Sequence, residues 1–181
     1  IRVSRDLGLN RIEYPQATRK PIGFVTSGMA HGYLVQTLLE LGLLGESPIL
    51  KYGLTYPIDP DLVRELARQC ERIVVVEERR AFLEPQVSEV VEKDRQAGRP
   101  EGLVEVWGKT FPDSLPGLPE IRGLHPSIII ERLVPLFKLI SSGGKPGSPG
   151  RSAGMRAEEA LAREIRTIDS TAQLDVGNVP V

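Results

Sequence analysis

Three short apolar segments constrain the fold of this chain more than any other feature. They cover residues 22–26, 48–52 and 73–76, and each ends in small, polar or charged residues. Each is followed by a stretch whose apolar residues recur at helical spacing. This alternation of strands and helices is typical of an open parallel sheet, in which the loops after the strands carry function.

The segment 73–76 consists of four β-branched residues, which predicts a central strand covered on both faces. The pattern of residues 103–107 predicts a fourth strand. Residues 10–13 are expected to form either a short edge strand or a linker. A loop rich in proline and glycine follows over residues 110–125. Pro126 then begins a last helix, which Pro135 is expected to kink or end.

Local signals predict where the helices begin and end. Asp59 is expected to cap a helix whose first turn contains Pro60, and Gly42 is a candidate stop for the preceding helix. Cys70 is placed on the apolar face of the helix that begins at Pro60. We interpret it as a small core residue rather than a reactive thiol, because no cationic neighbour is arranged to lower its pKa.

The chain divides into three predicted parts. Residues 1–20 form an N-terminal linker or edge strand, and residues 21–140 form the α/β domain. Residues 141–181 are expected to form a flexible linker and tail that lead to a further domain, since residues 141–154 are rich in Gly, Ser and Pro. Within this tail, residues 157–168 are a candidate short helix. The chain is therefore expected to be a piece of a longer polypeptide.

Composition narrows the classes of partner. The 181 residues include 23 basic and 24 acidic side chains, with a net charge of -1. This balance argues against a nucleic acid or a membrane surface as partner, since both attract a basic excess. One cysteine cannot form an internal disulfide, so we expect a reducing, cytoplasmic compartment. It also cannot hold an iron–sulfur cluster, and the two histidines suggest no metal site.

The residues that follow the three strands form the candidate site. They are Ser27, Gly28, His31, Thr55, Tyr56, Glu77 and Glu78. We expect them to meet at one edge of the sheet, as either a ligand cleft or a domain interface. No catalytic residue and no metal ligand is assigned within this chain.

Each candidate has two interpretations. Gly28 and Gly32 only partly match a phosphate-binding loop, and the favoured interpretation is a tight turn at Gly28 and close helix–sheet packing at Gly32. His31 is either a proton donor to a ligand or a polar residue satisfied by a neighbouring loop. Glu77 and Glu78 point to opposite faces of an extended segment, so one can face a cleft while the other pairs with an arginine.

The three segments together resemble a known family. Residues 22–33, 52–59 and 73–78, followed by Phe82-Leu83-Glu84, are similar to the middle, transketolase C-terminal-like domain of the indolepyruvate ferredoxin oxidoreductase alpha subunit. The resemblance covers about residues 10–140. It implies an α/β fold with three α/β/α layers and a mostly parallel sheet of about five strands, one of them an antiparallel edge strand.

The resemblance also implies a function for the parent enzyme. Such an enzyme oxidatively decarboxylates arylpyruvates or related 2-oxoacids to acyl-coenzyme A and passes electrons to ferredoxin. It would use thiamine pyrophosphate, magnesium and iron–sulfur clusters, with a beta subunit and ferredoxin as partners. This chain lacks both the G-D-G…N motif and the cluster cysteines, so it is expected to bind no cofactor and to serve as a non-catalytic structural domain. The alternative is a free-standing α/β module that binds a ligand or regulates.

Overall fold

The computed structural model describes residues 1–121, 123–142 and 159, and contains one five-stranded sheet. The strands are β1 (Arg11–Glu13), β2 (Lys20–Ser27), β3 (Ile49–Tyr52), β4 (Cys70–Val76) and β5 (Glu105–Trp107), in the order β1-β3-β2-β4-β5. Four of them are parallel, and β1 pairs antiparallel with β3. This confirms the α/β fold with about five strands, including the edge strand around Ile12.

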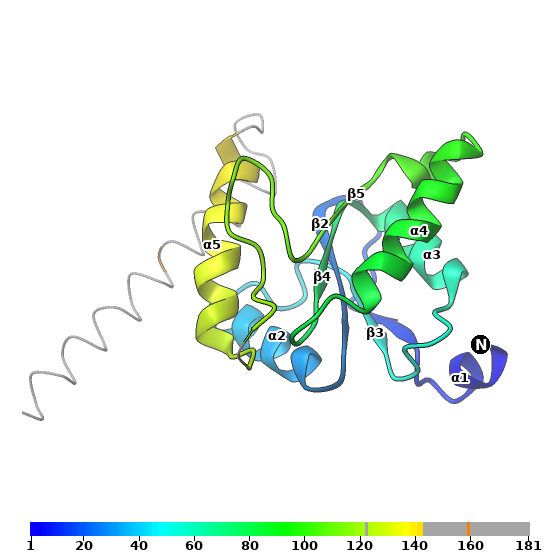
Figure 1. Cartoon of the computed structure of the whole chain (residues 1–181), viewed down its shortest axis with the longest axis horizontal. Helices are drawn as coiled ribbons and strands as arrows, with labels where there is room; N and C mark the ends of the chain where they lie inside the picture. The colour runs from blue at the N-terminus through cyan, green and yellow to red at the C-terminus, as the bar shows by residue number, and fades with distance from the viewer. Residues whose placement is uncertain (122, 143–158, 160–181) are drawn as a thin grey trace, which may run out of the picture.

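Helices cover both faces of the sheet (Figure 1). On one face lie α2 (Gly28–Glu40) and α5 (Pro126–Ser142), and on the other lie α3 (Pro60–Gln69) and α4 (Leu83–Gln96). Alternate residues of the central strands face the two layers. Val74 and Val76 join the cluster under α2 and α5, while Ile73 and Val75 join the cluster under α3 and α4. The run of β-branched residues is therefore buried on both sides, as predicted.

The structure confirms the helix start predicted at Asp59 and the helix end predicted at Gly42. The Asp59 side chain accepts a hydrogen bond from the Asp61 amide, 3.1 Å away, and Pro60 is the first residue of α3. Gly42 follows α2 with a φ of 66°, in the left-handed region that favours glycine. The short helices α1 (Arg2–Asp6) and η1 (Pro100–Leu103) were not predicted, because neither carries enough residues to show a period.

Two predictions about elements are wrong. Cys70 begins strand β4 instead of continuing α3, although it is fully buried as expected. Helix α5 runs through Pro135 to Ser142, so the prediction that the proline could end the helix is wrong. Buried side chains on both sides of the proline, Val134 and Leu136, hold the helix against the sheet, and their burial offsets a cost of about 3 kcal/mol.

The predicted linker and tail lie almost wholly outside the described residues. Helix α5 includes Ser141 and Ser142, which the sequence assigns to the linker. The candidate helix over residues 157–168 falls outside the described part of the chain, apart from Glu159. Within the part that is described, no helix combines the length and the apolar character needed to cross a bilayer.

Candidate functional site

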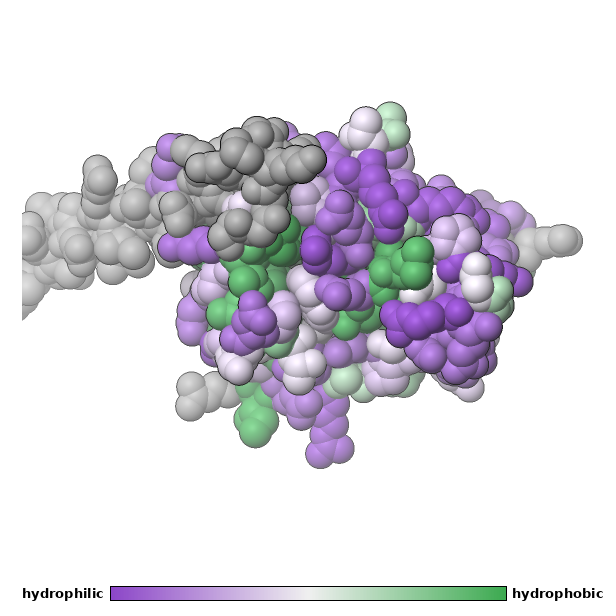
Figure 2. Space-filling view, turned by 90° about the horizontal axis from the view of Figure 1, so that it is seen from above, coloured by the Kyte–Doolittle hydropathy of each residue, from purple (hydrophilic) through white to green (hydrophobic). Residues whose placement is uncertain are grey.

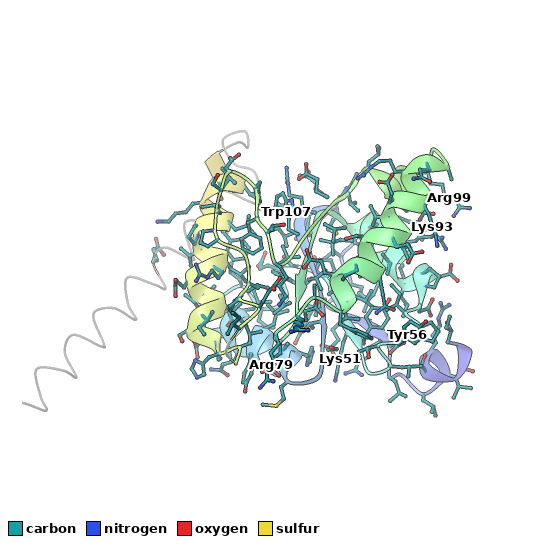
Figure 3. All side chains as sticks on the ribbon, in the orientation of Figure 1. Lys51, Tyr56, Arg79, Lys93, Arg99 and Trp107 are labelled. Atoms are coloured by element: carbon teal, nitrogen blue, oxygen red, sulfur yellow. The ribbon has the colours of Figure 1, made fainter. Side chains whose placement is uncertain are left out.

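The three predicted loops lie at the same edge of the sheet, which we call the carboxyl edge. Ser27 at the end of β2 is the register partner of Tyr52 at the end of β3, and Thr26 pairs with Val76 at the end of β4. The loops that begin at Gly28, Gly53 and Glu77 therefore leave three adjacent parallel strands at one level. In Figure 3 the labelled Tyr56 and Arg79, from two of these loops, lie on the same side of the molecule.

Glu77 is a structural cap for helix α4. Its carboxylate accepts hydrogen bonds from the backbone amides of Phe82, Leu83 and Glu84, at 2.9, 2.8 and 3.2 Å. The residue is 5% exposed. Because both oxygens accept bonds from the otherwise unsatisfied amides of the first helical turn, this side chain is not placed to take a proton from a ligand.

Glu78 has a different environment from Glu77. It is exposed, as are Arg79 and Arg80, and Arg79 has a φ of 56°. Across the described residues, neither glutamate forms an ion pair with an arginine, so the predicted pairing is wrong. The two carboxylates thus act separately: one caps a helix, and the other faces solvent.

Gly28 makes the turn from β2 into α2. Its φ of 54° is left-handed, while Ser27 before it is extended and its hydroxyl makes no capping bond. The tight-turn interpretation of Gly28 agrees with this geometry. The expected close packing at Gly32 is wrong, because a side chain there would meet no atom within 4 Å. The close approach occurs instead at Gly23, where an added Cβ would lie 2.9 Å from the Cys70 sulfur.

His31 contacts a carboxylate that is distant in sequence. Its Nε2 lies 2.7 Å from Oε2 of Glu13, which also pairs with Arg11. Burial raises the pKa of Glu13, but the hydrogen bond and charge of His31, with the charge of Arg11, outweigh burial and lower it. His31 therefore joins α2 to the edge strand β1, which agrees with the interpretation of a polar residue satisfied by a neighbour.

Thr55 and Tyr56 belong to the loop between β3 and α3. The Thr55 carbonyl accepts a hydrogen bond from the Gln86 side chain of α4, at 3.1 Å. Tyr56 is 70% exposed. Thr55 thus helps to fix the loop, while Tyr56 presents its ring to the outside.

Two residues at this edge were missed by the sequence interpretation, Glu84 and Lys109. The Lys109 amide donates to Glu84, and its ammonium group donates to the carbonyls of Glu77 and Pro119. Burial raises the pKa of Glu84 and lowers the pKa of Lys109. The contacts with Glu84 and Glu77 join the loop after β5 to α4 and to the end of β4, across 25 and 32 residues, and no local motif indicates them.

The chain's own residues do not fit a thiamine pyrophosphate and magnesium site. In the described ranges, no three His, Cys, Asp or Glu side chains are grouped so as to hold a metal ion. The carboxylate best placed at the strand ends, Glu77, is already bound by three amides. Burial raises the pKa of Cys70 to about 12, so its thiol does not supply a thiolate ligand at neutral pH.

Sequence comparison identifies related proteins. The family model described as "Indolepyruvate oxidoreductase domain" matches residues 14–133. A curated indolepyruvate oxidoreductase subunit IorA from Methanothermobacter thermautotrophicus is 38% identical over 122 residues, 67% of this chain and 18% of that protein. The IorA subunit of Methanothermobacter marburgensis is 36% identical over 86 residues, 48% of this chain and 13% of that protein.

The chain is therefore similar to less than one fifth of the length of these curated relatives. Among solved structures, a chain described as "Split gene transketolase, inactive beta4 tetramer" covers 84% of this chain and 42% of its own length. Its sequence identity to this chain is 16% and its TM-score is 0.43.

Proposed function

The chain belongs to the indolepyruvate oxidoreductase domain family, as a domain of the alpha subunit of a 2-oxoacid oxidoreductase, and we propose that its own role is structural. The observation that supports this proposal is that side chains at the carboxyl edge are already engaged in contacts within the fold. The side chains with suitable chemistry there, Glu77, His31 and Lys109, are each bound to other parts of the same fold. The domain would organise the subunit, while cofactors bind elsewhere in it.

For the parent enzyme we propose the oxidative decarboxylation of an arylpyruvate. The 2-oxoacid and coenzyme A would yield the acyl-coenzyme A, carbon dioxide, one proton and two electrons. The electrons would pass to two molecules of oxidised ferredoxin through iron–sulfur clusters. We also propose that the parent enzyme uses thiamine pyrophosphate with magnesium, binds a beta subunit and is located in the cytoplasm. This proposal rests on the family rather than on a residue of this chain.

We propose the division of parts that the sequence suggests, with residues 21–140 as the body of the domain, residues 1–20 as the segment that adds its edge strand, and residues 141–181 as a connection to the next domain. The seven candidate residues would then mark a domain interface instead of a ligand cleft, with the exposed Tyr56 and Glu78 facing the neighbouring domain. The competing function, a free-standing ligand-binding or regulatory module, has no built site to support it among the described residues.

The test uses the full-length subunit together with its partner subunit. Indolepyruvate should support ferredoxin reduction that depends on coenzyme A, and substitutions Thr55→Ala, Glu78→Gln and His31→Gln should change kcat and KM by about twofold or less. A loss of 100-fold or more in kcat, with the assembly intact, would assign catalysis to this edge. No oxidation of any 2-oxoacid would refute the proposed reaction itself.

A further inference from the structure

Apolar side chains gather at one corner of the carboxyl edge. We define the apolar corner as Val3, Leu7, Leu9, Leu54 and Tyr56, whose exposed fractions are 69, 68, 46, 39 and 70%. Together they expose on the order of 500 Å², which is the size of the largest apolar patch on a typical monomer, and such a patch is often functional. Figure 1 shows α1 beside the loop that connects β3 to α3, and Figure 3 shows Tyr56 on that side of the molecule.

The N-terminal half of this corner is fixed to the fold by polar contacts. Arg5 of α1 donates through Nε to the buried carboxylate of Asp59, at 2.9 Å. Asp59 also caps α3, and its carbonyl accepts the Tyr52 hydroxyl at 2.9 Å. Helix α1 is thus attached to the start of α3, with Val3 and Leu7 directed outward.

The second half of the corner is fixed by Asn10. Its side-chain oxygen accepts the amides of Gly53 and Leu54, at 3.0 and 2.9 Å, and its amide group donates to Ser4. The Gly53 amide also donates to the Leu9 carbonyl, which lies so close that a Cβ at residue 53 would be 2.8 Å from that oxygen. Hydrogen bonds therefore hold the backbone segments that carry Leu9 and Leu54 next to one another.

Covering exposed apolar surface is favourable, because it removes that surface from water. Preorganisation by such hydrogen bonds also favours binding, because binding then loses little conformational freedom. Figure 2 views the opposite side of the molecule, where exposed apolar groups lie among many hydrophilic residues. Residues 1–9 and 53–58 contain no lysine, and the charges of Arg2 and Arg5 are balanced by those of Asp6 and Asp59, so the corner has no basic excess that would attract an anionic lipid surface.

From this geometry we infer that the apolar corner is covered by another domain of the same polypeptide. The inference rests on the proposed function, since the curated IorA relatives are more than five times as long as the segment matched here. A domain joined through a short flexible linker would be present at an effective concentration in the millimolar range, which favours it over a second molecule. The exposed area suits an interface between domains of one chain, which buries about 600–1,500 Å².

The test places the photo-crosslinking residue p-benzoylphenylalanine at position 56 of the full-length subunit. The control places it at Leu103, which is 74% exposed at the end of η1, near the opposite edge. We expect irradiation to join position 56 to a peptide outside residues 1–181 of the same molecule, with at least tenfold more product than at position 103. The subunit mass on a denaturing gel should stay that of one chain.

Other outcomes overturn the inference. A product of twice the mass would show that a second copy covers the corner, and a crosslink to added lipid vesicles would show a membrane surface. Equal yields at positions 56 and 103 would show a free surface. Indolepyruvate oxidation is measured separately, so a failed reaction with a successful crosslink would refute the proposed function and leave the corner as an interface.

A second measurement uses Leu7→Glu with Leu103→Glu as its matched control. In the full-length subunit, Leu7→Glu should increase the rate of proteolysis between domains by about fivefold or more, while Leu103→Glu should not. Both variants of residues 1–181 alone should keep the circular dichroism spectrum of the parent chain. Equal proteolysis of the two full-length variants would contradict the inference.

Discussion

At the residue scale, one carboxylate of the predicted pair has a defined structural role. Glu77 satisfies three amides at the start of α4, whereas Glu78 faces solvent. We expect Glu77→Ala to lower the free energy of unfolding by roughly 2–3 kcal/mol, because it removes the cap and leaves buried amides unpaired. Urea unfolding followed by circular dichroism measures this.

The matched control is Glu78→Ala, which should change the free energy of unfolding by about 0.5 kcal/mol or less. Glu77→Gln should lie between the two, since one amide oxygen still accepts hydrogen bonds. Equal unfolding midpoints for Glu77→Ala and Glu78→Ala would contradict the capping role.

Gly23 offers a second test at this scale. A Cβ there would lie 2.9 Å from the Cys70 sulfur and 3.0 Å from Cδ1 of Leu66. Gly23→Ala should therefore lower the free energy of unfolding by about 1–3 kcal/mol, because the core would be overpacked. Gly32 lies within helix α2 with open space around it, so Gly32→Ala should instead raise the free energy of unfolding by up to about 1 kcal/mol. Thermal unfolding distinguishes them, and a neutral Gly23→Ala would show that the strand and helix α3 can separate.

At the scale of elements, α3 and α4 are joined through a buried carboxylate. Asp94 of α4 accepts hydrogen bonds from Arg64 of α3 and from Arg99 after α4, at 2.8 and 2.9 Å. The hydrogen bond from Arg64 is the main cause that lowers the pKa of Asp94, and it outweighs burial. This ion pair fixes the layer of helices on one face of the sheet.

The lowered pKa gives a pH dependence with a definite sign. Ionised Asp94 stabilises the fold above its unfolded-state pKa of about 3.9, and this stability is lost as pH falls through the lower folded-state value. Asp94→Asn should lower the free energy of unfolding by roughly 2–4 kcal/mol at pH 7 and by clearly less at pH 2. Unfolding in urea at both pH values measures the difference.

Glu92→Gln is the control, since Glu92 forms an exposed ion pair with Arg95 on the same helix. It should change stability by about 0.5 kcal/mol or less at either pH. If Asp94→Asn lowers the free energy of unfolding equally at pH 2 and pH 7, then packing, and not charge, accounts for the loss of stability.

At the scale of the whole molecule, the described residues form one α/β unit in which Glu77 and His31 of the candidate site are bound by contacts within the fold. We expect residues 1–181 alone to bind no thiamine pyrophosphate in the presence of magnesium, because the described residues offer no grouped metal ligands and Glu77 is already bound. Isothermal titration calorimetry tests this. Binding at one site per chain with a micromolar Kd would contradict the structural role.

The sequence by itself determined the alternation of strands and helices, the sites of the Asp59 cap and the Gly28 turn, and the burial of Cys70. These features depend on side-chain periods and on contacts within a few residues, so a local pattern is enough to predict them. The order of the three segments also carried the resemblance to the indolepyruvate oxidoreductase family, which the family match confirms.

Only the tertiary structure decided what the candidate residues contact. His31 meets Glu13 across 18 residues, Lys109 meets Glu77 across 32, and Asn10 meets Leu54 across 44. Helix α5 continues past Pro135 because the core on both sides of it is buried. Such partners are set by how strands and helices pack, and packing brings together residues whose spacing along the chain has no period.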